Sequence, residues 1–308
     1  MKKIFQRLLV FSIALPLIFA LVVFLPQWNH LALNLVILAF IGLGAVEFSV
    51  ILGNKGVFPG DPCPAPAKGL RRVPLRRQVE AAILGILAPL AATAASGFFP
   101  VRGDPDPGGF VFSAVFILEG IWVLLSRVFT SEAGLRDYTF HVVSGFSVMV
   151  YPGLFLVWFI RMGSLANSSP VILTFLLMVF GSDSVAWAAG MLFGKGNRGI
   201  VAASPNKSVA GFAGGIGASI LVGVGAEFFI KSAFLPRFLP PLAGGIILGF
   251  LSGCASSLGD LAESALKRSS GMKDSGTLIP GRGGVLDSID SVALAAPVFY
   301  LAYRILFQ

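Results

Sequence analysis

The chain has 308 residues, of which 56% are hydrophobic and 12% are charged, and its mean hydropathy is +0.86. Soluble domains carry about 25% charged residues, so this composition excludes an ordinary soluble protein and indicates one that lies mainly in lipid. The net charge of +8 requires no nucleic acid partner, because the basic residues are distributed as a membrane topology would distribute them.

Nine segments are long and apolar enough to cross a hydrocarbon core of about 30 Å, which takes about 20 helical residues. In chain order they are 8–26, 30–53, 79–99, 109–129, 140–160, 170–193, 209–230, 238–258 and 288–307. The sequence therefore predicts an all-α integral membrane protein with about nine transmembrane helices. A basic start before an apolar run is also typical of a signal peptide, but we expect the first helix to remain uncleaved.

Lysine and arginine residues are concentrated in alternate connections between these segments. If the N-terminus is cytoplasmic, 18 of the 23 basic residues fall in the cytoplasmic pieces 1–7, 54–78, 127–139, 194–208 and 259–287. This asymmetry follows the positive-inside rule. We therefore expect a multi-pass protein of the cell inner (cytoplasmic) membrane whose active site faces the cytoplasm.

Residues that suit chemistry are concentrated late in the chain. We expect an N-terminal transmembrane supporting region, 1–165, and a C-terminal catalytic transmembrane region, 166–308, with cytoplasmic loops at 194–208 and 259–287. The proline- and arginine-rich loop 54–78 is predicted to be a solvated basic loop, and contact with an anionic lipid headgroup is the alternative.

Four acidic residues fall within or near predicted spans. An aspartate at mid-membrane costs about 2.5–3.5 kcal/mol, so Asp183 should face a polar cavity or a cation unless its neighbouring serines satisfy a protonated carboxyl group. Glu47, Glu119 and Glu227 are each expected to form interhelical hydrogen bonds or to lie at the interface, and Glu47 is the strongest candidate for a further role.

Two short motifs after the sixth span could hold phosphate oxygens on a cytoplasmic loop. Lys195 stands between two glycines, and Lys207 lies in the sequence Ser-Pro-Asn-Lys-Ser that begins at Ser204. The spacing of a P-loop is absent. We attribute the glycines at 214–217 to close helix packing.

The stretch 260–291 brings together acidic, basic and glycine residues. Asp260, Glu263 and Lys267 share one face at helical spacing, and further cations and the glycine-rich segment 281–284 follow. Backbone amides of such glycines can approach a ligand closely ahead of a helix that begins near Asp287.

Asp287 and Asp290 are three residues apart, so they share a face of that helix's first turn. Carboxylates at a helix start can simply favour its dipole. Their position beside several cations fits Mg2+ held between carboxylates and a polyphosphate better. The residues therefore predict metal-assisted phosphoryl or nucleotidyl transfer.

These motifs resemble those of the phosphatidate cytidylyltransferases, also called CDP-diacylglycerol synthases, over residues 140–305. The positions that match the C-terminal signature are Ser264, Leu266, Lys267, Arg268, Lys273, Asp274, Gly276, Ile279, Pro280, Gly283, Gly284, Val285, Asp287, Ile289 and Asp290. The upstream pattern is matched by Asp183, Phe193-Gly194-Lys195, Ser204-Pro205-Asn206-Lys207-Ser208 and Gly214-Gly215.

The resemblance implies that CTP and phosphatidate react to give CDP-diacylglycerol and pyrophosphate with Mg2+, with a second metal ion or K+ left open. It implies catalytic roles for Asp260, Lys267, Asp287 and Asp290, and metal ligation by Asp183, Asp260 and Asp287. The implied substrate-binding residues are Lys195, Ser204, Lys207, Ser264, Arg268, Lys273, Asp274, Arg282, Gly283 and Gly284. Bilayer lipid and a second copy, in a homodimer, are the further implied partners.

Two positions depart from the family pattern: Arg282 replaces a histidine and Ser288 replaces an arginine. Arg282 can still bind a phosphate, but it cannot act as a general base because it stays protonated. Three alternatives remain open at this point: another CTP-dependent lipid enzyme, an inactive paralogue, and, from a different class, a secondary transporter.

Overall fold

The structure is a computed structural model that describes the whole chain except residues 1, 55–72, 99–106, 130–131, 133–134 and 136. Most of the loop 54–78 lies outside the described residues. For residues 2–11, 97, 98 and 107 only the backbone is considered.

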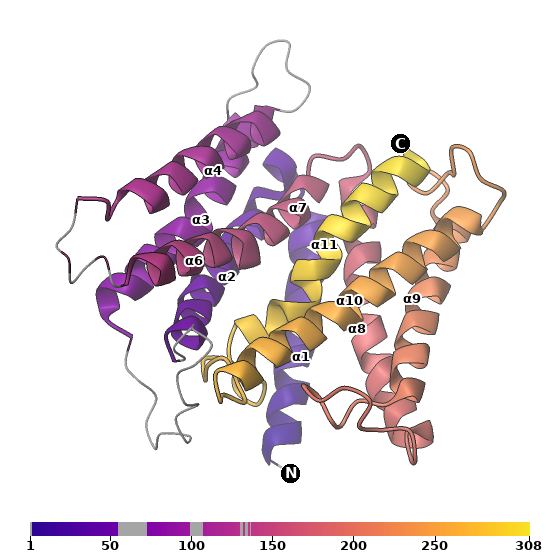
Figure 1. Ribbon diagram of the computed structural model, residues 1–308. Helices are drawn as coiled ribbons and strands as arrows, with labels where there is room; N and C mark the ends of the chain where they lie inside the picture. The colour runs from indigo at the N-terminus through magenta and orange to yellow at the C-terminus, as the bar shows by residue number, and fades with distance from the viewer. Residues whose placement is uncertain (1, 55–72, 99–106, 130–131, 133–134, 136) are drawn as a thin grey trace.

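The described residues form helices joined by short loops (Figure 1). The first half contains α1 (Lys2–Phe24), α2 (Gln27–Gly53), α3 (Leu75–Phe98), α4 (Pro107–Leu125), α6 (Tyr138–Val148), the π-helical turn η1 (Met149–Leu154) and α7 (Phe155–Met162). The second half contains α8 (Ser168–Phe193), α9 (Val209–Phe229), α10 (Ala243–Ser269) and α11 (Leu286–Phe307).

The predicted all-α membrane fold is confirmed. Eight helical stretches are long and apolar enough to span a bilayer, and Ser12–Phe24 within α1 is a shorter apolar helix. The described part of the chain contains no strand beyond two isolated bridges. An all-helical fold is expected here, because a helix satisfies its backbone hydrogen bonds internally in the absence of water.

Two predicted spans differ from the observed helices. The span at 140–160 is broken into α6, η1 and α7, because Pro152 cannot donate a backbone hydrogen bond and Tyr151 adopts an extended backbone. The span predicted at 238–258 is displaced, because α10 begins at Ala243 and continues to Ser269. The predicted loop 259–287 is therefore helical over its first eleven residues.

Helix α11 lies at the centre of the molecule and is the most buried of the eight spanning helices. It packs against α10, α7, α2 and α8, between the α2–α4 group on one side and the α8–α10 group on the other (Figure 1). Aromatic rings spaced four residues apart form its core face, with the Phe299 ring 5.1 Å from that of Phe175 and 6.1 Å from that of Tyr303.

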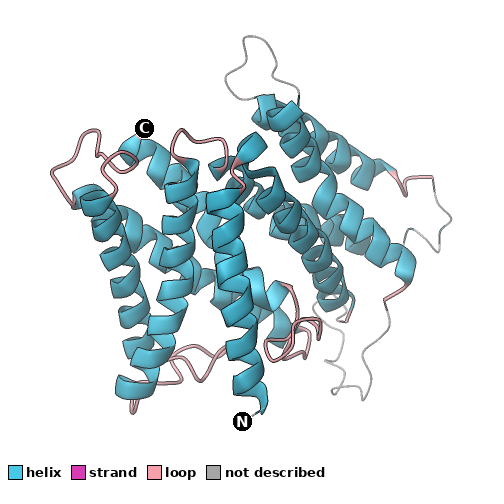
Figure 2. Cartoon of the chain, turned by 180° about the vertical axis from the view of Figure 1, so that it is seen from behind, coloured by secondary structure: helices cyan, strands magenta, loops and turns pink. Residues whose placement is uncertain are grey.

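The N-terminus lies at the same end of the bundle as the loops at 194–208 and 270–285, and the C-terminus lies at the opposite end (Figures 1 and 2). The two loops that carry most of the candidate site residues therefore meet on one side of the molecule. The distribution of basic residues predicts that these two loops lie on the same side of the membrane.

Glycines allow α9 and α10 to touch backbone to backbone. A Cβ at Gly249 would lie 2.5 Å from both the Ser219 carbonyl oxygen and the Ile220 Cα. Small residues at a helix crossing allow this close approach in membranes. The packing assigned to the glycines at 214–217 is confirmed for Gly214 and Gly215, which face α8. A Cβ at Gly217 would meet no atom of another element within 4 Å.

We predict that Gly249→Ala lowers the stability of the protein by about 1–3 kcal/mol, because the added methyl group forces the two backbones apart. The melting temperature in detergent would measure the loss. Gly217→Ala on α9 is the matched control and should leave that temperature unchanged. Equal melting temperatures for both variants would show that α9 and α10 can separate at no cost.

Candidate active site

The ammonium group of Lys267 joins α10 to α11. Its Nζ lies 2.5 Å from Glu263 Oε2, one helical turn earlier, and also contacts Asp287 Oδ1 at the start of α11. The Glu263 side chain is fully buried, and the side chains of Lys267 and Asp287 are 12% and 6% exposed. The sequence correctly placed Glu263 and Lys267 on one helix face.

Asp287 also anchors the loop that precedes α11. Its Oδ2 accepts hydrogen bonds from the Ser275 amide at 2.9 Å, the Ser275 hydroxyl at 3.1 Å and the Gly284 amide at 2.7 Å. Gly283 has φ +115°, a backbone conformation that residues other than glycine rarely adopt. A Cβ at Gly284 would collide with Ser275 and Glu47. The glycines therefore allow the loop to close around two carboxylates.

The second of these carboxylates, Glu47, comes from α2. It accepts hydrogen bonds from the Ser275 hydroxyl at 2.7 Å, the Val285 amide at 3.0 Å and the Leu286 amide at 2.8 Å. A carboxylate is stabilised at a helix start by the free amides and by the helix dipole. Glu47 thus caps α11 and links the N-terminal half of the chain to the site.

Lys207 and Asp260 form a separate ion pair, with Nζ 2.6 Å from Oδ2. Ser264 donates to the other oxygen of Asp260 at 3.4 Å. Lys207 is placed by the turn before α9, whose first residue follows the N-cap Ser208, and the Ser208 hydroxyl accepts from the Gly211 amide at 3.0 Å. This pair is more exposed than the Lys267 cluster, at 23% for Lys207 and 35% for Asp260.

A cavity of about 590 Å³ opens beside this ion pair, between α8, α9 and α10. Asp183 and Asp260 both line it, so Asp183 faces a polar cavity as the sequence predicted. Lys207 and Arg198 supply positive charge at the same cavity. Its remaining lining includes Trp187, Met191, Phe212 and small residues.

Asp290 is buried and interacts electrostatically with Asp260 and Asp183, which line the cavity. Arg282 interacts with both Asp290 and Asp183, so the residue that departs from the family pattern lies near the carboxylates. Gly259 allows this clustering, because a Cβ there would lie 2.5 Å from the Asp290 carbonyl oxygen where α10 crosses α11.

Sequence reasoning missed two polar residues near these acids. The Tyr151 hydroxyl is buried without a hydrogen-bond partner among the described residues, and it interacts electrostatically with Asp290, Glu263, Asp260 and Asp287. Arg198 lines the cavity and donates to the Gly190 carbonyl at 3.0 Å. Neither stands in a motif that would single it out.

Other predicted site residues do not line the cavity. Lys195, Arg268, Lys273 and Asp274 are exposed, and Ser204 is half-buried in its turn. Ser288 is the second departure from the family pattern. Its hydroxyl donates a hydrogen bond to the Gly284 carbonyl at 3.3 Å and so stabilises the start of α11. The substrate-binding roles of the exposed residues, of Ser204, and of Gly283 and Gly284 stay predictions.

The described residues contain no group of three or more His, Cys, Asp and Glu side chains that could hold a metal ion by themselves. Asp183 and Asp260 nevertheless face one cavity, and Mg2+ in nucleotide sites is commonly bound by one or two carboxylates together with substrate phosphates. These two residues fit that role. Both oxygens of Asp287 are already engaged by Lys267, Ser275 and Gly284.

We predict that Glu47→Ala increases hydrogen exchange of the backbone amides of Val285 and Leu286, because both lose their acceptor. Leaving such donors unpaired costs about 1–3 kcal/mol each. Exchange measured by mass spectrometry on peptides covering 275–290 would report it. The control is Asp137→Asn, which removes an exposed ion pair with Arg77; unchanged protection in Glu47→Ala would contradict the capping role.

Comparison with known proteins places this arrangement in a family. The model of the Cytidylyltransferase family matches residues 77–306. The chain is similar to proteins named phosphatidate cytidylyltransferase from Synechocystis (40% identical over 132 residues, 41% of this chain), Mycobacterium bovis (33% over 205 residues, 63%) and Bacillus subtilis (37% over 189 residues, 61%). It covers 43%, 63% and 64% of their respective lengths.

The family match extends from the start of α3 to the end of α11 and includes every candidate site residue except Glu47. The chain therefore belongs to the cytidylyltransferase family.

Proposed function

We propose that the protein is a phosphatidate cytidylyltransferase, which converts CTP and phosphatidate to CDP-diacylglycerol and pyrophosphate. The observation that carries the proposal is the cavity in which Lys207, Asp260 and Asp183 meet at the loop end of a membrane bundle. It places cationic and carboxylate groups beside lipid-facing helices, as a reaction between a nucleotide and a membrane lipid requires. Family membership and the names of the relatives support the same reaction.

In this reaction a phosphate oxygen of phosphatidate attacks the α-phosphorus of CTP in line. A new P–O–P bond forms, the bond from the α-phosphorus to the oxygen that bridges to the β-phosphorus breaks, and pyrophosphate leaves. Such phosphoryl chemistry depends mainly on positioning and on charge stabilisation. Lys207 and Arg198 provide positive charge at the cavity, and Arg282 provides it from the loop before α11.

A divalent cation, Mg2+ by our proposal, would be held by Asp260 and Asp183 and would neutralise charge on the triphosphate when bound. Asp290 is buried and interacts electrostatically with both residues, and by our proposal it orients the start of α11 or joins the metal shell. Lys267, Glu263 and Asp287 hold the loop and α11 in place around the cavity. A metal-ligating role for Asp287 remains a prediction that would require its release from Lys267.

The cavity also suits the lipid substrate. Trp187 and Met191, both more than half exposed, line it from α8 where that helix faces the membrane. We infer that the acyl chains remain in the bilayer and that the phosphate enters sideways between α8 and α9. By our proposal the loop end faces the cytoplasm of an inner-membrane protein, where CTP is available, and the homodimer stays a prediction.

Pyrophosphate release by the purified protein in detergent would test the proposed function. Release should require CTP, phosphatidate and Mg2+ together, and should fail with ATP or without lipid. Release with another lipid acceptor would identify a different CTP-dependent lipid enzyme. No release from folded protein would favour an inactive paralogue or a transporter.

We predict that Asp260→Asn lowers kcat by roughly 100-fold or more and raises the Mg2+ concentration needed for half-maximal rate, because one anionic ligand is lost. Rates measured across a Mg2+ titration would show both effects. Asp137→Asn, an exposed acid far from the cavity, should keep the normal rate and Mg2+ dependence. A normal Mg2+ dependence in Asp260→Asn would remove this residue from the metal site.

A further inference from the structure

A second cavity lies in the N-terminal half, between α3 and α4, and plays no part in the proposed reaction. It has a volume of about 840 Å³ and is lined mostly by apolar side chains of these two antiparallel helices. Helix α4 packs on α3 and α6, on the opposite side of the molecule from α8, α9 and α10 (Figure 1). The groove between α3 and α4 is therefore separate from the cavity at Asp260.

The groove is apolar along its length and cationic at one end. Val79, Ile83 and Leu87 form a stripe along α3, and Leu118 and Trp122 face them from α4. All five side chains are exposed, so the groove opens toward the membrane. Arg76 at the start of α3 and Arg127 just beyond the end of α4 line the same end of the groove.

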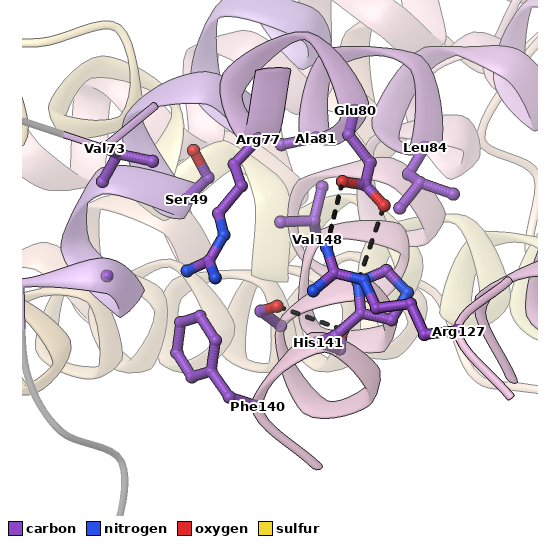
Figure 3. A pocket seen from close by; sticks show the side chains of 13 residues that line it. Ser49, Val73, Arg77, Glu80, Ala81, Leu84, Arg127, Phe140, His141 and Val148 are labelled. Atoms are coloured by element: carbon purple, nitrogen blue, oxygen red, sulfur yellow. Dashed lines mark hydrogen bonds and ion pairs between the residues drawn. The ribbon is translucent and has the colours of Figure 1, made fainter. Parts of the chain in front are cut away.

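The arginines at this end are only partly neutralised by the protein. The guanidinium of Arg127 is 3.8 Å from Glu80 Oε2, and the other oxygen of Glu80 lies 3.5 Å from the His141 ring (Figure 3). Glu80 supplies one negative charge against the two positive charges of Arg127 and Arg76 at this end of the groove. The end of the groove carries a net positive charge that attracts an anion.

Inside the groove, Glu119 is an unexplained polar group. Its side chain is 5% exposed and neither carboxyl oxygen has a hydrogen-bond partner among the described residues. The sequence favoured an interhelical hydrogen bond or a position at the membrane interface for Glu119, and no such bond is present among the described residues. Buried polar groups without a partner are costly, which indicates that a ligand supplies the missing bond.

We propose that this groove binds one anionic glycerophospholipid, distinct from the reacting lipid. Its phosphate lies between Arg76 and Arg127, and one acyl chain follows the apolar stripe of α3. Glu119 lies seven residues before Ser126, so Glu119 is about 10 Å farther along the helix axis from the cationic end of the groove. The first polar atoms of a phospholipid below its phosphate are the ester carbonyls, and the Glu119 carboxyl group in its protonated form can donate a hydrogen bond to one of them.

Fluorescence of Trp122, which lines the groove, would detect the lipid directly. The protein would be placed in phosphatidylcholine nanodiscs containing increasing fractions of phosphatidylglycerol with brominated acyl chains. The quenching of Trp122 is the wild-type signal minus that of Trp122→Phe. We expect half-maximal quenching at a roughly 25-fold lower fraction of brominated phosphatidylglycerol than of brominated phosphatidylcholine, because two basic residues contribute about 1 kcal/mol each.

Charge variants test the headgroup contact. Arg76→Gln and Arg127→Gln should each weaken the phosphatidylglycerol preference about fivefold, the effect of about 1 kcal/mol per basic residue. Arg304→Gln, on the last turn of α11, is the control and should keep the preference. Arg76 lies exposed at the start of α3, so its variant tests the contact even if Arg127→Gln disturbs the Glu80 ion pair.

The ester contact has its own test. Wild-type protein should bind ester-linked phosphatidylglycerol about two- to tenfold more tightly than the ether-linked form, which has no carbonyl groups. Glu119→Leu should remove this difference. Equal quenching by phosphatidylglycerol and phosphatidylcholine would overturn the proposal in favour of bulk lipid, and absence of quenching by either in a dimeric protein would show that a second copy covers the groove.

Discussion

The buried ammonium group of Lys267 determines how the ends of α10 and α11 meet. It contacts Glu263 on its own helix and Asp287 at the start of the next, in surroundings where little water is present to replace either partner. Removing one member of such a buried cluster leaves an uncompensated charge, which is strongly destabilising. Asp287 in turn holds Ser275 and Gly284, so the shape of the whole loop depends on this one cation.

The same loop is held from the other half of the chain by Glu47. Its carboxylate accepts hydrogen bonds from the amides of Val285 and Leu286 at the start of α11, where the helix dipole favours negative charge. Because α2 supplies this cap, the N-terminal region does more than support the catalytic region: it sets the position of the helix that carries Asp287 and Asp290. The predicted division at residue 165 therefore runs through this arrangement, because Glu47 lies before it and Asp287 lies after it.

Hydropathy predicted which segments are helical, because the membrane leaves few alternatives to a helix. Hydropathy alone ended the eighth span at residue 258, whereas the helical spacing of Asp260, Glu263 and Lys267 correctly indicated that the helix continues; α10 extends for about three more turns, to Ser269. The pairing of Lys207 with Asp260 and the cap provided by Glu47 could not be predicted, because both join residues far apart in the sequence. The lack of a protein partner for Glu119 among the described residues could not be predicted either, because no sequence pattern reports it.

The two lysine pairs at the site differ in a way that separates their roles. Lys267 and Glu263 are buried, so opening their ion pair would leave charges in apolar surroundings at a cost of several kcal/mol. Lys207 and Asp260 are partly exposed beside a cavity, where an ion pair contributes about 1 kcal/mol or less and water can replace either partner. In the proposed reaction Lys207 would therefore exchange its carboxylate for a substrate phosphate, and Asp260 would be free to hold a metal ion in place of the ammonium group. Each exchange makes the other easier, because it removes the competing partner, so binding of nucleotide and metal ion at this cavity is expected to be mutually reinforcing.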